Sequence, residues 1–273
     1  MVSPIFKNGK KDKVENYRPT SLVCNCAKVF EFVLHKILLF SLHSRITEFQ
    51  HGFVNGRSTT TNLCAFTQFV SDAFESKLQV DVAYIDFSKA FDKLNHNILL
   101  AKLLNIGLSD SFVKLIRSYL FNRSMIVKYQ GYQSHEVEVC SGVPQGSVLG
   151  PLFFVIFIND IIVNIKSNVL IYADDIKIFK TISSMEDCLI LQNDLTTFLH
   201  WSNSNLLPVN FDKSYVMSYT NKNFQILYNY TLNNIFLSRV DTFKDLGVIF
   251  DSKLTFHNHI NAVTSEAFKS LGF

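Results

Sequence analysis

The sequence at residues 80–92 reads VDVAYIDFSKAFD and combines an apolar segment with an acidic end. Residues 80–87 are rich in β-branched and aromatic side chains, which predicts a β-strand. Asp86 stands at the end of this mostly apolar strand, where a carboxylate is unfavourable unless a partner compensates for its burial. This aspartate therefore marks a candidate functional site.

A second acidic feature, YADD, lies at residues 172–175. Alternating apolar segments flank it and predict a hairpin with Asp174 and Asp175 at its tip. Neighbouring aspartates repel each other, and protons or cations must offset that repulsion. If this hairpin and the strand at 80–87 are sheet neighbours, three carboxylates converge and suit hard divalent cations. Two such ions about 4 Å apart are the usual device for in-line phosphoryl transfer.

Each acidic feature also has a simpler explanation when it is taken alone. Asp174 and Asp175 could form a polar turn, and Asp92 could pair with Lys89 on the surface of a helix. The sequence contains no phosphate-binding P-loop, no GxSxG and no HExxH that would offer a competing site. We therefore favour the metal-binding interpretation of the two features together.

Composition excludes several classes of protein. The 273 residues are 48% hydrophobic with a formal net charge of +3, which excludes extensive disorder and permits one large or two small domains. The longest uncharged apolar stretch, residues 148–159, is too short to span a bilayer. The N-terminus lacks the features of a secretory signal, and the five cysteines are scattered. We expect reduced thiols in the core of an intracellular protein, nuclear or cytoplasmic and not secreted.

Positive charge is concentrated near the N-terminus. Residues 1–60 contain nine lysines and arginines against four acidic residues, whereas the remainder is close to neutral. Such a region could contact a polyanion. A solvated surface run at residues 7–13 is the alternative that charge alone favours.

The order of the predicted elements indicates an α+β fold. Helices are predicted at 24–47, 60–76, 97–104, 111–120, 152–165 and 185–201, and strands at 80–87, 169–172, 176–179, 209–219 and 243–250. A further hairpin is predicted from segments 125–130 and 135–140 on either side of GYQS.

Seven stretches, in order, resemble the reverse transcriptase domain of non-LTR (LINE-type) retrotransposons, with the jockey-like group the most similar. They are residues 4–22 and 50–63 (fingers motifs), 84–96 (motif A), 141–154 (motif B), 172–175 (motif C), 205–214 (motif D) and 244–256 (the primer-grip hairpin region). The resemblance implies an α+β right-hand polymerase fold whose palm has an antiparallel sheet with helices. It implies fingers over 1–80, palm over 81–100 and 138–255, a connection over 101–137, and the start of a largely missing thumb over 256–273.

The resemblance also implies a role for each matching residue. Asp86, Asp174 and Asp175 correspond to the catalytic, metal-binding acids, and the main-chain carbonyl of Phe87 to an additional metal ligand. The expected cofactor is Mg²⁺, as two ions, with Mn²⁺ as a possible substitute. In the same family, the position of Phe91 is a steric gate that rejects the ribonucleotide 2′-hydroxyl.

Four more residues match positions that contact the nucleotide. Gln145 resembles the residue that touches the incoming nucleotide, and Gly142 and Gly146 would let the backbone approach it. The remaining matches are basic residues. Lys7 and Arg18 stand where fingers residues hold the triphosphate, and Lys213 resembles a lysine that protonates the leaving pyrophosphate.

The implied partners are an RNA template, a DNA primer and dNTPs, with no membrane. The endonuclease and thumb regions of a full-length element are expected to be missing from this chain. An RNA-dependent RNA polymerase is disfavoured, because such enzymes generally place a polar group at the position of Phe91 and glycine before the two aspartates. A relic that binds RNA or DNA through phosphate contacts without catalysis remains the alternative.

Overall fold

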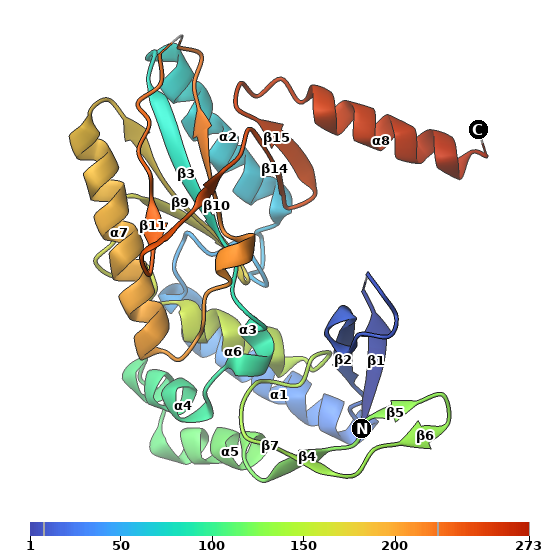
Figure 1. The fold of residues 1–273 in the computed structure, drawn as a ribbon. Helices are drawn as coiled ribbons and strands as arrows, with labels where there is room; N and C mark the ends of the chain where they lie inside the picture. Colours follow the sequence, from blue (N-terminus) through green and yellow to red (C-terminus); the bar gives the residue numbers. More distant parts are fainter. Residues whose placement is uncertain (8, 223, 273) are drawn as a thin grey trace. The chain divides into compact units, whose positions relative to one another are not determined.

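The computed structural model describes residues 1–7, 9–222 and 224–272, and it divides into two compact units (Figure 1). The first unit comprises Met1–Glu48, Ser88–Asp160 and Asn203–Pro208. The second unit comprises Phe49–Phe87, Ile161–Ser202 and Val209–Phe273. Each unit is described separately below.

A five-stranded sheet organises the second unit, with strands in the order β13-β10-β3-β9-β8. All neighbours are antiparallel except β13, which runs parallel to β10. The strands are β3 (Gln79–Ile85), β8 (Asn168–Tyr172), β9 (Asp175–Ile182), β10 (Tyr215–Tyr219) and β13 (Ser238–Arg239). Every residue of β3 is buried, as expected for a central strand covered on both faces.

Helices cover both faces of this sheet (Figure 1). On one face, Phe66 and Val70 of α2 (Thr59–Glu75) pack with Tyr84 of β3 in one apolar cluster. The other face is covered by α7 (Met185–Ser204), which buries Cys188, Leu191, Leu195 and Phe198. The sheet is therefore held between two apolar helix faces.

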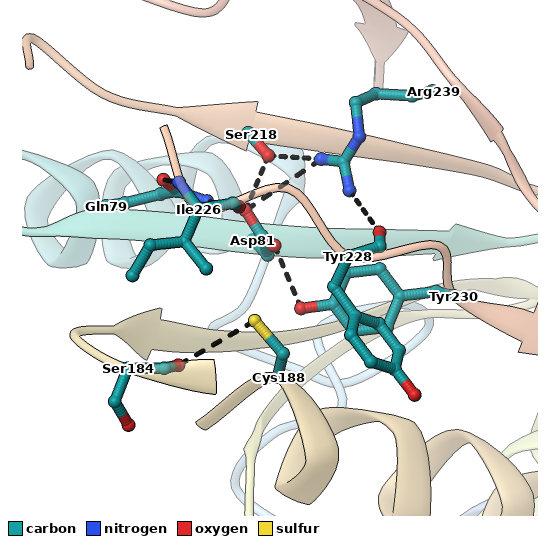
Figure 2. A network of polar contacts seen from close by, with 9 residues as sticks. All are labelled: Gln79, Asp81, Ser184, Cys188, Ser218, Ile226, Tyr228, Tyr230 and Arg239. Carbon is teal, nitrogen blue, oxygen red and sulfur yellow. Dashed lines mark hydrogen bonds and ion pairs between the residues drawn. The ribbon is translucent and has the colours of Figure 1, made fainter. Parts of the chain in front are cut away.

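A buried polar network anchors the chain after β10 to the α7 side of the sheet (Figure 2). The fully buried carboxylate of Asp81 accepts hydrogen bonds from Gln79, Ser218 and Tyr230 at 2.5–2.8 Å. Arg239 lies 4.0 Å from the same carboxylate and donates to the carbonyl of Tyr228 at 2.7 Å. Because each donor is matched by an acceptor, the network can remain in the interior.

The predicted strand at 243–250 is wrong. This segment is a hairpin of β14 (Thr242–Asp245) and β15 (Val248–Asp251), joined by Leu246 and Gly247. Both turn residues have positive φ, which is the conformation of a tight hairpin turn. The apolar pattern continues across the turn and concealed it. A short hairpin, β11 (Thr231–Leu232) and β12 (Ile235–Phe236), and the helix α8 (His257–Ser270) complete this unit.

The first unit is mainly helical, and its strands form short pairs. The helices are α1 (Asn25–Leu42), α3 (Ala90–Lys93), α4 (His96–Asn105), α5 (Asp110–Leu120) and α6 (Leu149–Ile158). A buried carboxylate, Glu31 of α1, accepts hydrogen bonds from Tyr119 of α5 and from the N–H of Val148 at the start of α6. Three helices are thus joined through one side chain, and the acid also favours the N-terminus of α6.

Short antiparallel pairs complete the first unit. They are β1 (Val2–Phe6) with β2 (Tyr17–Ser21), β4 (Arg123–Met125) with β7 (Val137–Val139), and β5 (Lys128–Tyr129) with β6 (Tyr132–Gln133). The predicted hairpin near GYQS is present. Its turn lies at Gln130 and Gly131, both with positive φ, and therefore earlier than expected. Short 3₁₀ turns occur at Val14–Asn16, His43–Arg45 and, in the second unit, Phe211–Lys213.

Two predicted helices differ by more than three residues from the observed limits. α6 was expected at 152–165, but it begins at Leu149 and ends at Ile158. The next residue, Asn159, uses its side chain to bind the main chain of Arg45 and Thr47 and so lies at the end of the helix. The helix predicted at 24–47 ends at Leu42, before the 3₁₀ turn at His43–Arg45.

The cysteines are free, but the expectation that they lie in the core is wrong for four of them. Cys24, Cys26, Cys64 and Cys140 are exposed, and Cys188 is buried against the sheet. Within residues 1–7, 9–222 and 224–272, none of the helices has both the length and the apolar character required to cross a membrane.

Candidate functional site

Strand pairing places the acidic features next to each other. β3 pairs with β9 in a register that sets Ile85 opposite Ile176, so the following position sets Asp86 opposite Asp175. β8 pairs with β9 through Tyr172 and Asp175, which leaves Ala173 and Asp174 as the two-residue turn. The condition for convergence of the acids, that their strands be sheet neighbours, is therefore met.

The electrostatics of Asp175 reflect this crowding. The side chain keeps an exposed surface, but the protein atoms packed around its carboxyl group remove water and raise its pKa to about 7. The negative charges of Asp174, Asp245 and Asp86 raise the pKa further, whereas the ammonium of Lys177 lowers it. A bound cation would relieve this repulsion.

The donors at this place are those that hard divalent cations prefer. They are carboxylate oxygens, with the main-chain carbonyl of Phe87 next in the chain. Among the described residues, no three histidine, cysteine, aspartate or glutamate side chains stand in an arrangement ready to hold a metal ion. The carboxylate oxygens and the repulsion between these acids both favour a bound cation. To coordinate one, the aspartate side chains would have to move closer together.

Two residues of the segment 205–214 fix Asp86 on the side away from β9. The Asn210 N–H donates to the carbonyl of Asp86 at 2.8 Å, and its side-chain amide lies 3.3 Å from the Asp86 carboxylate. Ser214 accepts from the N–H of Asp86 at 3.3 Å and donates to the carbonyl of Asn210. Sequence reasoning assigned no role to Asn210 or Ser214, although both lie in the stretch identified as motif D.

Lys213, predicted as a proton donor, lines a cavity of about 80 Å³ that Asp86 and Asp175 also line. Its side chain is exposed. The ion pair of Lys177 and Asp245 forms another wall of the cavity, and neither residue was singled out from the sequence. Lys177 is flanked by apolar residues in the sequence IKIF, and this pattern could have indicated a buried charge.

Phe87 itself is a core residue. Its ring lies 5.8 Å from that of Phe198 and 6.4 Å from that of Trp201, and its main chain forms an antiparallel bridge with Val209. This packing fixes the backbone directly after Asp86. A role for the Phe87 carbonyl as a ligand stays a prediction.

The other predicted residues belong to the first unit. Arg18 lies opposite Ile5 in the β1–β2 pair, and Lys7 follows β1, two residues after Ile5. Cross-strand partners and residues two apart share a face, so Lys7 and Arg18 extend from the same face of this hairpin. Both side chains are exposed. Two adjacent exposed cations on a short hairpin are able to bind an anion.

Phe91 and Gln145 are brought together by the loop between β7 and α6. Gln145 donates to the Asp92 carboxylate at 2.7 Å, so Asp92 has a partner other than Lys89. The Phe91 ring is half-buried and stacks on Phe154 with ring centres 4.5 Å apart. The carbonyl of Gln145 accepts from Ser21 of β2, which links this loop to the strand that carries Arg18.

Gly142 is required at its position by the chain itself. It has φ of +78°, and a Cβ there would meet the Asp92 carbonyl oxygen at 2.7 Å. Its own carbonyl accepts hydrogen bonds from His96 at 2.7 Å and Arg123 at 3.0 Å, two residues that sequence reasoning did not select. That Gly142 makes room for a nucleotide stays a prediction. The close approach of the Asp92 main chain already requires a residue without a Cβ at this position.

A family model and individual relatives of known name both identify the same protein family. The sequence model of the family described as "Reverse transcriptase (RNA-dependent DNA polymerase)" matches residues 7–273. The chain is 34% identical over 271 residues to the RNA-directed DNA polymerase from mobile element jockey of Drosophila funebris, covering 95% of this chain and 29% of that protein. It is 31% identical to the jockey polymerase of Drosophila melanogaster, covering 97% of this chain and 30% of the relative. The chain thus spans about 30% of the length of these relatives.

Among solved structures, apo telomerase from Candida tropicalis truncated from its C-terminal domain is similar, with a TM-score of 0.59. The match covers 88% of this chain and 52% of that one, at 14% identity. A second structure of apo telomerase from the same organism gives a TM-score of 0.57 at 12% identity. These similarities confirm the α+β right-hand polymerase fold.

Proposed function

Because the chain belongs to the reverse transcriptase (RNA-dependent DNA polymerase) family, we propose that it catalyses RNA-directed DNA synthesis. In this reaction the 3′-hydroxyl of a DNA primer, annealed to an RNA template, attacks the α-phosphate of a dNTP and releases pyrophosphate. The observation that carries the proposal is the pairing of β3 with β9, which sets Asp86 beside the Asp174–Asp175 turn.

The acids would serve as the metal centre. Asp86, Asp174 and Asp175, with the Phe87 carbonyl, would hold divalent cations, and we propose two Mg²⁺ ions with Mn²⁺ as a substitute. Such ions, when bound, stabilise the negative charge of the attacking and leaving oxygens. The contribution of this chain is to orient the two carboxylates, through Asn210 and Ser214 at Asp86 and through strand pairing at Asp175.

Each of the remaining predicted residues would have a role toward the nucleotide. Lys7 and Arg18 would bind the triphosphate, because exposed cations on one hairpin face complement phosphate oxygens. Gln145 and the Phe91 ring would contact the base and sugar, with Phe91 excluding a 2′-hydroxyl. Lys213, beside the acids, would give a proton to the departing pyrophosphate.

The remaining parts of the proposal concern the biological context. We propose that the chain acts inside the cell, in the nucleus or cytoplasm, as part of a retrotransposon polymerase. The fingers at 1–80, the palm at 81–100 and 138–255, the connection at 101–137 and the thumb entry at 256–273 stay our assignment of subdomains.

Primer extension by the purified chain, on an RNA template with dNTPs and Mg²⁺, tests the function. Template-dependent addition of dNTPs supports the polymerase. Salt-sensitive binding of the primer–template without extension, over a range of Mg²⁺ and Mn²⁺ concentrations, would instead favour the alternative of a non-catalytic nucleic-acid-binding relic.

A further inference from the structure

Gln50 contacts the backbone of the acidic turn from a buried position. Its side chain is 1% exposed, and its Oε1 accepts two main-chain hydrogen bonds. One comes from the N–H of Gly52 at 2.7 Å and the other from the N–H of Ala173 at 3.1 Å. Because Ala173 directly precedes Asp174, one buried oxygen joins the segment at 50–52 to the turn.

The main chain around Gln50 is itself held against β8. The carbonyl of Phe49 accepts from the N–H of Ile171 at 2.9 Å, and the N–H of His51 donates to the carbonyl of Ile171 at 2.8 Å. Gln50 and Ile171 thereby form a parallel bridge. The side chain of Gln50 is therefore presented from a backbone that is fixed on both sides.

The turn that Gln50 contacts has an unfavourable backbone conformation. Ala173 has φ of +55°, in the left-handed region that residues with a Cβ avoid. Gly52 approaches so closely that a Cβ on it would lie 2.4 Å from the nitrogen of Ala173. A strained backbone conformation persists only where surrounding contacts hold it in place. Here the contacts come from the segment at 50–52.

Stability alone does not explain a glutamine at this position. Within the part of the chain that the structure describes, Nε2 of Gln50 is buried without a hydrogen-bond partner. An unpartnered buried amide is unfavourable, and methionine would fill the same space without one. The acceptor oxygen is the feature that glutamine offers here and methionine lacks.

We propose that Gln50 is a positioning residue for catalysis. Its Oε1 holds Ala173 in the left-handed conformation and thereby sets the direction in which Asp174 and Asp175 extend. Gln50 touches neither the nucleotide nor the reacting atoms in this assignment. The inference rests on the proposed function, because it gives these two aspartates a role in the reaction.

The test compares Gln50→Met with Gln79→Met. Gln79 is also 1% exposed and hydrogen-bonded, but it lies at the opposite end of β3 from Asp86 and is a matched control for loss of a buried amide. For each variant we would measure the melting temperature, the hydrogen exchange of the Ala173 amide, the affinity for Mn²⁺ alone, and primer extension.

Gln50→Met should expose the Ala173 amide to faster exchange and weaken Mn²⁺ binding. It should lower kcat by about 100-fold, as expected for a misplaced catalytic group, with a much smaller change in the KM for dNTP. Gln79→Met should lower the melting temperature while leaving the other three readouts near wild type. Adding Ala173→Gly to Gln50→Met should recover part of the lost kcat, because glycine adopts the left-handed region without penalty.

Equal effects of Gln50→Met and Gln79→Met on Mn²⁺ affinity and kcat would overturn the proposal. If the wild-type chain does not extend primers, the proposed function fails. The hydrogen exchange of the Ala173 amide and the affinity for Mn²⁺ then still decide whether Gln50 positions the turn. If Gln50→Met does not fold, Gln50→Glu takes its place because it keeps an acceptor oxygen. Retained protection of Ala173 in that variant would support the proposal, and lost protection would contradict it.

Discussion

The ammonium nitrogen of Lys177 lies 2.5 Å from a carboxylate oxygen of Asp245, and both side chains are only 4% exposed. Lys177 belongs to β9, two residues after Asp175, and Asp245 is the last residue of β14. The pair therefore joins the strand of the acidic site to the β14–β15 hairpin. Tyr84 adds a second contact between sheet and hairpin, because its ring stacks on Phe243 at 4.0 Å.

Breaking this pair should be costly. Asp245→Leu leaves the buried ammonium of Lys177 without its carboxylate, and we expect a loss of about 3–5 kcal/mol in the free energy of unfolding. The double variant Lys177→Met/Asp245→Leu should recover most of that loss, since a buried pair replaced by apolar groups is often neutral. Urea unfolding at equilibrium measures both values. If Asp245→Leu were as stable as wild type, the ammonium group of Lys177 would have to be accessible to water in solution.

The acidic site should make the metal-free protein less stable as the pH rises. The folded-state pKa of Asp175 is raised to about 7 from its usual 3.8, so the folded state binds this proton more tightly than the unfolded state. The resulting stabilisation is fully present below pH 3.8 and is lost as the pH rises through about 7.

Asp175→Asn provides the measurement for this pH effect, because asparagine stays neutral throughout. In EDTA, the melting temperature of the variant should exceed that of wild type at pH 8, and the gap should shrink at pH 5. A gap of the same size at both pH values would show that the carboxyl group of Asp175 titrates in its ordinary range.

Phe91 offers a test that distinguishes a DNA-synthesising site from an RNA-synthesising one. If its ring lies against the sugar, Phe91→Ala should raise the use of rNTPs far more than it changes the use of dNTPs, because the change removes a clash. The stacking on Phe154 means that the variant should also lose stability, up to the ~3–5 kcal/mol of a fully buried phenylalanine.

The ratio of kcat/KM for dNTP to that for rNTP, in wild type and Phe91→Ala, distinguishes the two roles of this ring. Melting temperatures measured alongside separate selectivity from stability. An unchanged ratio together with a lower melting temperature would assign Phe91 to the core alone.

The elements that carry the acids were predictable because their signals are local. Alternating apolar residues define β8 and β9, and the apolar run before Asp86 defines β3. The sequence could not distinguish Asp86 from Asp81 by residue type, since both lie in one apolar stretch. Only the structure shows Asp81 satisfied by Gln79, Ser218 and Tyr230 within the sheet.

The supporting residues were not predictable because their partners are distant in the chain. Gln50 reaches Ala173 across 123 positions, and Lys177 reaches Asp245 across 68. A local pattern contains no information about such pairs. The strand prediction at 243–250 missed the β14–β15 turn for a related reason, since the conformation of Leu246 depends on the strand pairing that encloses it. Only the family resemblance at 244–256 indicated a hairpin region there.

Single-nucleotide extension of an RNA-templated DNA primer by wild type and Asp174→Asn, side by side with Mg²⁺, tests the central claim most directly. Asp174→Asn removes a charged oxygen donor from the acidic turn without disturbing strand pairing. The account predicts dNTP addition by wild type and none above background by the variant, with equal or slightly higher melting temperature in the variant. Addition at the wild-type rate by Asp174→Asn would contradict the assignment of the acidic turn as the catalytic centre.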